Sequence, residues 1–271
     1  FHEAAHQFVG LTGRGGVPGW LNEAYASFFE GCTILSNGQV RWNEVATHRL
    51  FPVAARMEKG WMGDHADGVR DEAGEWATPE RAPTFRILVE NEYQWGPPWY
   101  APTWAVVYFL YNYRDSDSGQ PVYRDALHEY YLSGAGHRGR DGRVPHFESI
   151  VLKAKLSPVS SIDELDAIWR NWIIDVRDVQ LGKKAAGKSN LDRGEQALEQ
   201  GDLGLAEEFF DEAFLHSPED PEILWKLAGV LEEQGEKDRA LALFTSFARE
   251  MELRGTIEDA RYSIAREKIR K

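Results

Sequence analysis

Apolar residues recur at helical spacing near the start of the chain. The stretch 20–31 carries them three or four positions apart, which is typical of one face of a helix. Its apolar members are Trp20, Leu21, Tyr25, Phe28 and Phe29. A Gly- and Pro-rich stretch at 13–19 comes before it and favours a tight reversal. The start of the chain is therefore predicted to be a helix, a tight loop and a second helix.

The middle of the chain has the pattern of a helical domain with long loops. Helical spacing indicates a helix over 40–59, an aromatic helix at Tyr100–Leu110, and amphipathic helices within 147–172. Residues 60–83 are polar and rich in Gly, Asp and Glu, and residues 134–143 are rich in Gly and Arg. We expect both of these stretches to be surface loops. The fold class that follows is mainly α.

An internal repeat occupies residues 190–271. Three residue types recur 34 positions apart, and these are Gly201 and Gly235, Ala206 and Ala240, and Phe210 and Phe244. This period and pattern resemble the tetratricopeptide repeat (TPR), in which antiparallel helix pairs stack side by side. Helices are expected at 190–200, 203–216, 220–234 and 237–251, with a fifth at 256–270 capping the stack. A generic bundle of helical hairpins is the alternative. Repeats of this kind bind other proteins, so the region is a candidate site for a protein partner.

The chain is accordingly predicted to have two domains, 1–181 and 190–271, joined by a linker at 182–189. The linker spells G-x-x-x-x-G-K-S, which satisfies the P-loop pattern for nucleotide binding. A P-loop follows a strand, whereas Trp169, Trp172 and Ile173 before the linker lie at helical spacing. We interpret the segment as a flexible basic linker and expect no nucleotide.

The composition of the chain excludes some classes of binding partner and metal site. The net charge of −13 argues against nucleic acid, because phosphate binding requires a basic surface. Cys32 is the single cysteine, so no intrachain disulfide and no cysteine-based zinc site are expected, and the compartment stays open. No apolar run approaches the roughly 20 residues that span a bilayer.

The candidate chemistry lies at the very start, in the pattern H-E-x-x-H formed by His2, Glu3 and His6. Residues four apart lie on the same face of a helix, so the two histidines can hold one metal ion with Glu3 beside it. Catalytic zinc takes three protein ligands, and Glu23 on the second helix is the candidate for the third. A core helix that happens to carry two histidines is the structural alternative.

These motifs resemble the gluzincins, the zinc metallopeptidases that include thermolysin and the zinc aminopeptidases. The run Trp20–Ala26 (W-L-N-E-A-Y-A) is similar to the W-L-N-E-G-[FL]-A run of the aminopeptidases. The rival metzincin pattern requires Gly and His where this chain has Val9 and Thr12. The resemblance implies one zinc ion per chain held by His2, His6 and Glu23.

The segment that begins at Tyr100 resembles a second aminopeptidase motif, a helix whose leading tyrosine stabilises the oxyanion. A phenol that donates to an oxygen as its charge grows stabilises the transition state, so Tyr100 is a candidate catalytic residue beside the base Glu3. Thr103 stands where the family has glycine. Whether Tyr100 is catalytic or structural is left open by the sequence.

The residue that orients the zinc-binding histidines is a further question that the sequence raises. In thermolysin-like enzymes an acidic residue four positions after the third ligand orients a zinc histidine, but Ser27 occupies that position here. Ser27 or Asn22 is the candidate for this role. The family also carries, before the zinc helix, a sheet that binds substrate by strand addition. Because the chain opens on Phe1, we expect that part to be missing.

Two function classes remain. The first is a zinc peptidase acting on a peptide or protein, with zinc activating water and Glu3 moving the proton. The second is a binding or scaffold protein whose zincin-like domain does not turn over. A nucleotide-dependent enzyme is a distant third. The sequence does not distinguish exopeptidase from endopeptidase action.

Overall fold

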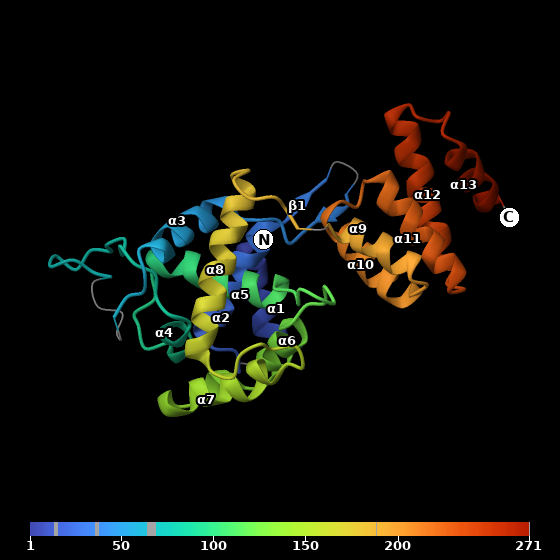
Figure 1. Ribbon diagram of the computed structural model, residues 1–271. Coiled ribbons are helices and arrows are strands. Elements are labelled where there is room, and N and C mark those ends of the chain that lie inside the picture. The colour runs from blue at the N-terminus through green and yellow to red at the C-terminus, as the bar shows by residue number, and fades with distance from the viewer. Residues whose placement is uncertain (14–15, 36–37, 64–68, 188, 271) are drawn as a thin grey trace. The chain divides into compact units, whose positions relative to one another are not determined.

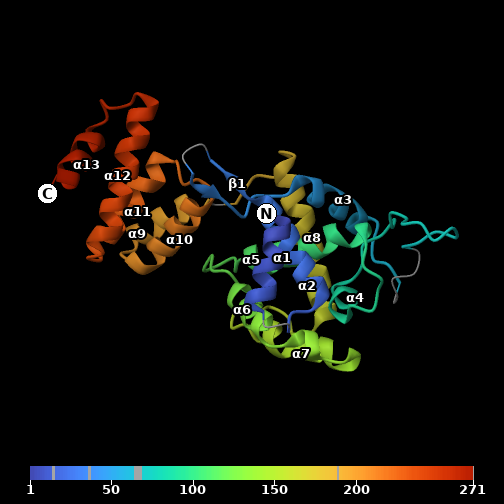
Figure 2. The same cartoon turned by 180° about the vertical axis from the view of Figure 1, so that it is seen from behind.

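The computed structural model describes residues 1–13, 16–35, 38–63, 69–187 and 189–270 of the chain, and most of them are helical (Figures 1 and 2). The chain forms two compact units. The first comprises Phe1–Gly31 and Val45–Ala185, and the second comprises Cys32–Glu44 and Ala186–Lys271. The predicted mainly α class is confirmed.

The first unit is built around one buried helix, α5. Its α-helices are α1 (His2–Thr12), α2 (Gly19–Phe28), α3 (Thr47–Glu58), α4 (Phe85–Glu90), α5 (Tyr100–Asn112), α6 (Arg124–Leu132), α7 (Arg140–Ile150) and α8 (Ile162–Gln180). Short 3-10 turns are η1 (Phe29–Gly31), η2 (Pro97–Trp99), η3 (Ala135–His137) and η4 (Val151–Lys153). Every residue from 101 to 110 is buried, and α2, α3, α6 and α8 pack around this helix. A helix that is apolar on all sides belongs in a core.

The turn between α1 and α2 depends on glycine. At Gly13 the backbone N–H donates to the carbonyl of Val9, and a Cβ atom added there would lie 2.3 Å from a methyl group of Val17. The chain then reverses, and Pro18 precedes the first residue of α2. The two predicted helices are confirmed and α1 packs against α2, while residues 14–15 of the predicted loop lie outside the described residues.

The outer face of α1 exposes large apolar side chains. Phe1, Phe8 and Leu11 are 55%, 57% and 83% exposed, whereas Ala5 and Val9 of the same helix are buried. The helix therefore buries only one side within the described residues.

The predicted helix over 40–59 is wrong in its first part. Residues Val40–Arg41 form strand β2, which pairs antiparallel with β1 (Thr33–Ile34), and α3 begins only at Thr47. Asn43 has a left-handed φ of 60° and interrupts any helix there. The N–H of Trp42 donates to the carbonyl of Leu215 at 3.3 Å. Cys32–Glu44 thus belongs to the second unit, which the predicted domain boundaries did not anticipate.

Both loops predicted in the first unit need refinement. Residues 134–143 contain η3 and the start of α7 rather than a continuous loop. Residues 60–83 form no helix or named strand where described, but they are not all at the surface. The Trp61 ring stacks on Trp169 at 5.8 Å, and Val69 and Ala82 are buried.

The second unit is a TPR-like helical solenoid, as predicted. Its helices are α9 (Asn190–Glu199), α10 (Leu203–His216), α11 (Pro221–Glu233), α12 (Lys237–Arg254) and α13 (Ala260–Arg270). The predicted ends are met closely, except that α12 extends three residues further and α13 begins four residues later. Gly201 and Gly235, one repeat apart, have left-handed φ values of 76° and 86° and end equivalent helices. Gly194 packs against the ring of Phe210, and a Cβ atom there would lie 2.4 Å from it.

The linker has no helix or strand at 182–187, and α8, not a strand, comes before it. Ser189, the last residue of the P-loop pattern, instead caps α9 by accepting a hydrogen bond from the backbone of Asp192. Among the described helices, none combines the length and apolar character needed to cross a membrane.

Candidate metal centre

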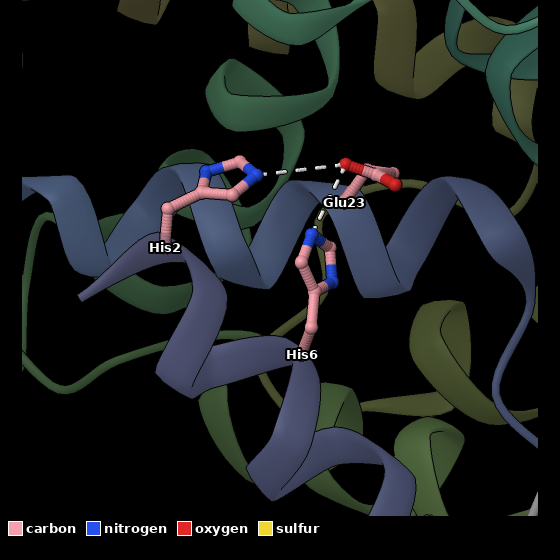
Figure 3. A group of neighbouring side chains, drawn as sticks. All are labelled: His2, His6 and Glu23. Atoms are coloured by element: carbon pink, nitrogen blue, oxygen red, sulfur yellow. Dashed lines mark ion pairs between the residues drawn. The ribbon is translucent and has the colours of Figure 1, made fainter.

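Three side chains from α1 and α2 converge on one point (Figure 3). His2 and His6 lie one helical turn apart on α1, and Glu23 faces them from α2. The Nε2 atoms of His2 and His6 lie 3.7 and 3.5 Å from the Oε2 atom of Glu23. One ligand atom from each of the three residues lies within 4.8 Å of the others.

These distances suit a shared metal ion. Two ligands of a tetrahedral zinc, each ~2.0–2.2 Å from the ion, are roughly 3.3–3.5 Å apart. The Oε2 atom of Glu23 is also buried and has no hydrogen-bonding partner among the described residues. A carboxylate oxygen buried in this way costs free energy unless a cation or donor satisfies it. Two imidazoles and one carboxylate are a donor set that zinc accepts, so the residues fit the metal.

Each histidine is oriented through its other ring nitrogen. The Nδ1 atom of His6 lies 3.1 Å from Oδ1 of Asn22, and that of His2 lies 3.0 Å from Oε1 of Glu30. Because both partners supply an acceptor oxygen, Nδ1 carries the proton and the Nε2 lone pair points toward Glu23. Asn22 therefore lies within hydrogen-bonding distance of a candidate ligand, as its proposed orienting role requires.

Ser27 does not share that role. Its side chain is fully buried, and its hydroxyl has no hydrogen-bonding partner in the part of the chain that the structure describes. Glu30, not Ser27, lies beside His2, because a residue seven positions after Glu23 is about two helical turns on and faces the same side. The sequence contained one signal for it, an acidic residue two helical turns after the third ligand.

Glu30 is held by the start of α3. Arg49 donates from Nε to Oε2 at 3.0 Å and from Nη2 to Oε1 at 2.9 Å, while Nε2 of His48 lies 3.1 Å from Oε2. Burial raises the pKa of the Glu30 carboxyl, but the hydrogen bonds and charge of Arg49, with hydrogen bonds to His48 and His2, outweigh it and hold that pKa below its usual value. Glu30 is therefore ionised at neutral pH and accepts from His2 as a carboxylate.

The two candidate catalytic side chains lie beside the histidines. Glu3 is exposed on α1 next to His2. Tyr100 begins α5, and its ring meets the His2 ring edge-on, with centroids 5.9 Å apart. The ring of Trp95 packs against Tyr100 at 5.2 Å, so the phenol is fixed between its neighbours.

Comparison with known proteins concerns the second unit. Residues 197–247 match the tetratricopeptide repeat family. The match covers α10 and α11 with the adjoining parts of α9 and α12, and includes none of the residues of the candidate metal centre. No curated protein and no solved structure gives a match. TPR units generally mediate contacts between proteins, which supports a protein partner for this region.

Proposed function

We propose that this protein is a zinc-dependent peptidase. The proposal is carried by the convergence of His2, His6 and Glu23, in which a buried carboxylate oxygen without a hydrogen bond faces two imidazole nitrogens. If two histidines lay on a helix by chance, there would be no reason for a separate acceptor to hold the Nδ1 atom of each one. Here Asn22 and Glu30 supply those acceptors.

The residues divide the work as follows. His2, His6 and Glu23 would hold the zinc, which when bound lowers the pKa of water and polarises a substrate carbonyl. Glu3 accepts a proton from water and passes it to the leaving amine. Its exposure on α1 leaves it open to solvent and substrate. Tyr100 donates a hydrogen bond to the carbonyl oxygen as negative charge develops there.

Asn22 and Glu30 keep the two histidines in the tautomer that presents Nε2 to the metal. Neither residue needs to touch the substrate. Their contribution is to metal affinity and to the precision with which the ligands are held.

A second candidate function is a non-catalytic binding or scaffold protein. The observation that favours it is the TPR match in the second unit. In that case the first unit would bind zinc as a structural element, and the partner of the TPR unit would be the physiological ligand.

The experiment uses the full chain. Zinc content is measured by elemental analysis, and cleavage is measured on a library of fluorogenic peptides. Glu3→Gln should retain zinc and lose cleavage, Glu23→Gln should lose zinc, and Glu129→Gln, an exposed substitution on α6, should change neither.

The outcomes separate the two functions. Zinc binding together with cleavage that depends on Glu3 supports the peptidase. Zinc binding without cleavage of any library member favours the scaffold, and failure to bind zinc overturns the metal centre itself.

A further inference from the structure

Arg49 contacts two sides of the candidate centre at once. Its guanidinium donates to both carboxylate oxygens of Glu30, and the same group lies over the Tyr100 ring, with Cζ 5.1 Å from the centroid. Glu30 in turn contacts His2, and His2 meets Tyr100. The four side chains therefore form a closed cycle in which each contacts the next.

We propose that Arg49 is a positioning residue that fixes the metal ligand His2, through Glu30, and the ring of Tyr100 relative to each other. The inference rests on the proposed zinc peptidase function for its catalytic consequence. Its structural part, the orientation of His2, does not depend on a bound metal.

The three side chains joined in this way come from three helices, of which α3 and α5 also pack directly against each other. His2 lies on α1, Tyr100 begins α5, and Arg49 is the third residue of α3. Direct contact between His2 and Tyr100 is limited to an edge-on approach of the rings, which is a weak constraint on either side chain. The guanidinium adds two hydrogen bonds on one side and a cation–π contact on the other.

The arrangement requires arginine in particular. Two parallel N–H groups match the two oxygens of Glu30, and the flat face of the same group covers an aromatic ring. A lysine ammonium is a compact charge without a flat face. It cannot donate side by side to both oxygens of Glu30 and also cover the Tyr100 ring. The side chain is 21% exposed, so its contacts are largely shielded from water.

Arg49 also holds together the chain around an insertion. The segment Cys32–Glu44 groups with the second unit, so the chain leaves the first unit after Gly31 and returns at Val45. Glu30 comes just before this segment and Arg49 just after it. Their ion pair therefore joins η1, where the chain leaves the first unit, to the start of α3, where it returns.

The test compares Arg49→Met and Arg49→Lys with a matched control, Arg86→Met. Arg86 makes the same kind of bidentate contact, donating from Nε and Nη2 to the two oxygens of Asp163 at 2.9 Å each. It lies on α4 and touches none of the four residues of the cycle. Removing it therefore reports the cost of losing an arginine–carboxylate pair in the same unit without disturbing the centre.

Zinc affinity of the full chain is measured by competition with a chelator. Removal of an outer contact of a metal ligand typically weakens binding about 10- to 100-fold, and we expect a loss of that order for Arg49→Met. Arg49→Lys should fall between Arg49→Met and the wild type, and Arg86→Met should bind as the wild type does. In the Glu30→Gln background, Arg49→Met should cause little further loss of affinity, because the effect on zinc passes through Glu30.

Two further readings make the test specific. In the zinc-free protein, ring-nitrogen NMR should show His2 as the Nδ1–H tautomer, and Arg49→Met should convert it to a mixture of tautomers. If the protein cleaves peptides, Arg49→Met in the Glu30→Gln background should still lower kcat with KM little changed, because the Tyr100 ring loses the guanidinium that covers it.

Equal zinc affinity and an unchanged His2 tautomer in Arg49→Met would overturn the inference while leaving the proposed zinc peptidase intact. A wild-type chain that bound no zinc would overturn the proposed function, and the tautomer measurement would still decide the role of Arg49. Should Arg49→Met fail to fold by circular dichroism, Arg49→Lys supplies the same comparison.

Discussion

Asp166 makes the stability of the first unit depend on pH. This carboxyl on α8 is 7% exposed and accepts one hydrogen bond, from the backbone N–H of Phe85 at 2.6 Å. Burial raises its pKa from 3.8 to about 7, although the Phe85 N–H partly opposes the change. The folded protein therefore holds a proton between these two pH values that the unfolded chain has already lost.

The sign and size follow from that difference. The free energy of unfolding should fall as the pH rises from ~4 to ~7 and then level off, because the folded state must finally ionise a buried group. A difference of ~3 pH units at ~1.4 kcal/mol per unit corresponds to roughly 4 kcal/mol. The variant Asp166→Asn keeps an oxygen for the Phe85 N–H and does not titrate, so it should lack this dependence.

The assay is urea unfolding of wild type and Asp166→Asn at pH 4 and pH 8, followed by tryptophan emission. Eight of the ten tryptophans lie in the first unit, so the signal reports mainly on its unfolding. Between pH 4 and pH 8, the free energy of unfolding of the variant should rise by about 4 kcal/mol relative to that of the wild type. Any pH-independent cost of the amide is the same at both pH values and cancels in this comparison. Asp115→Asn is the control, since hydrogen bonds from Ser118 lower the pKa of that carboxyl and Asp115 is not among the groups that act on Asp166. An equal difference in the free energy of unfolding between Asp166→Asn and wild type at both pH values would show that Asp166 does not cause the pH dependence.

Three further predictions concern the metal site, the repeat and one helix cap. Glu30→Gln should weaken zinc binding about 10- to 100-fold in a chelator competition, because a neutral amide replaces the carboxylate that orients a histidine. Gly194→Ala should destabilise the TPR unit by about 1–3 kcal/mol in thermal unfolding, since its Cβ would press into the ring of Phe210, whereas Gly229→Ala meets nothing within 4 Å and should stabilise by about 0.5–1 kcal/mol. Ser161→Ala should cost about 1 kcal/mol in urea unfolding, because it removes half of the capping box that begins α8.

The repeat was predictable because its packing is local and periodic. Small residues such as Ala206 and Ala240 recur with Phe210 and Phe244, and each helix pair packs mainly against its neighbour in sequence. The same locality explains the three candidate metal ligands. His2 and His6 are one helical turn apart, and α2 follows α1 after only six residues.

The features that were missed depend on distant partners. Strand β2 lies at the start of the helix predicted over 40–59, but it contacts α10, and Trp42 next to it donates to Leu215, 173 positions later in the chain. Glu30 lies seven positions after Glu23, whereas the resemblance to thermolysin-like enzymes directed attention to the position four after it, Ser27. Arg49 gave no signal in its own segment, because its two partners come from η1 and α5.

The most direct test of the central claim is zinc binding and peptide cleavage measured together on the full chain and on Glu3→Gln. A zinc peptidase with Glu3 as its base should bind about one zinc per chain in both proteins, with cleavage by the wild type and none by the variant. A wild-type chain without zinc, or a Glu3→Gln variant that cleaves as fast as the wild type, would contradict it.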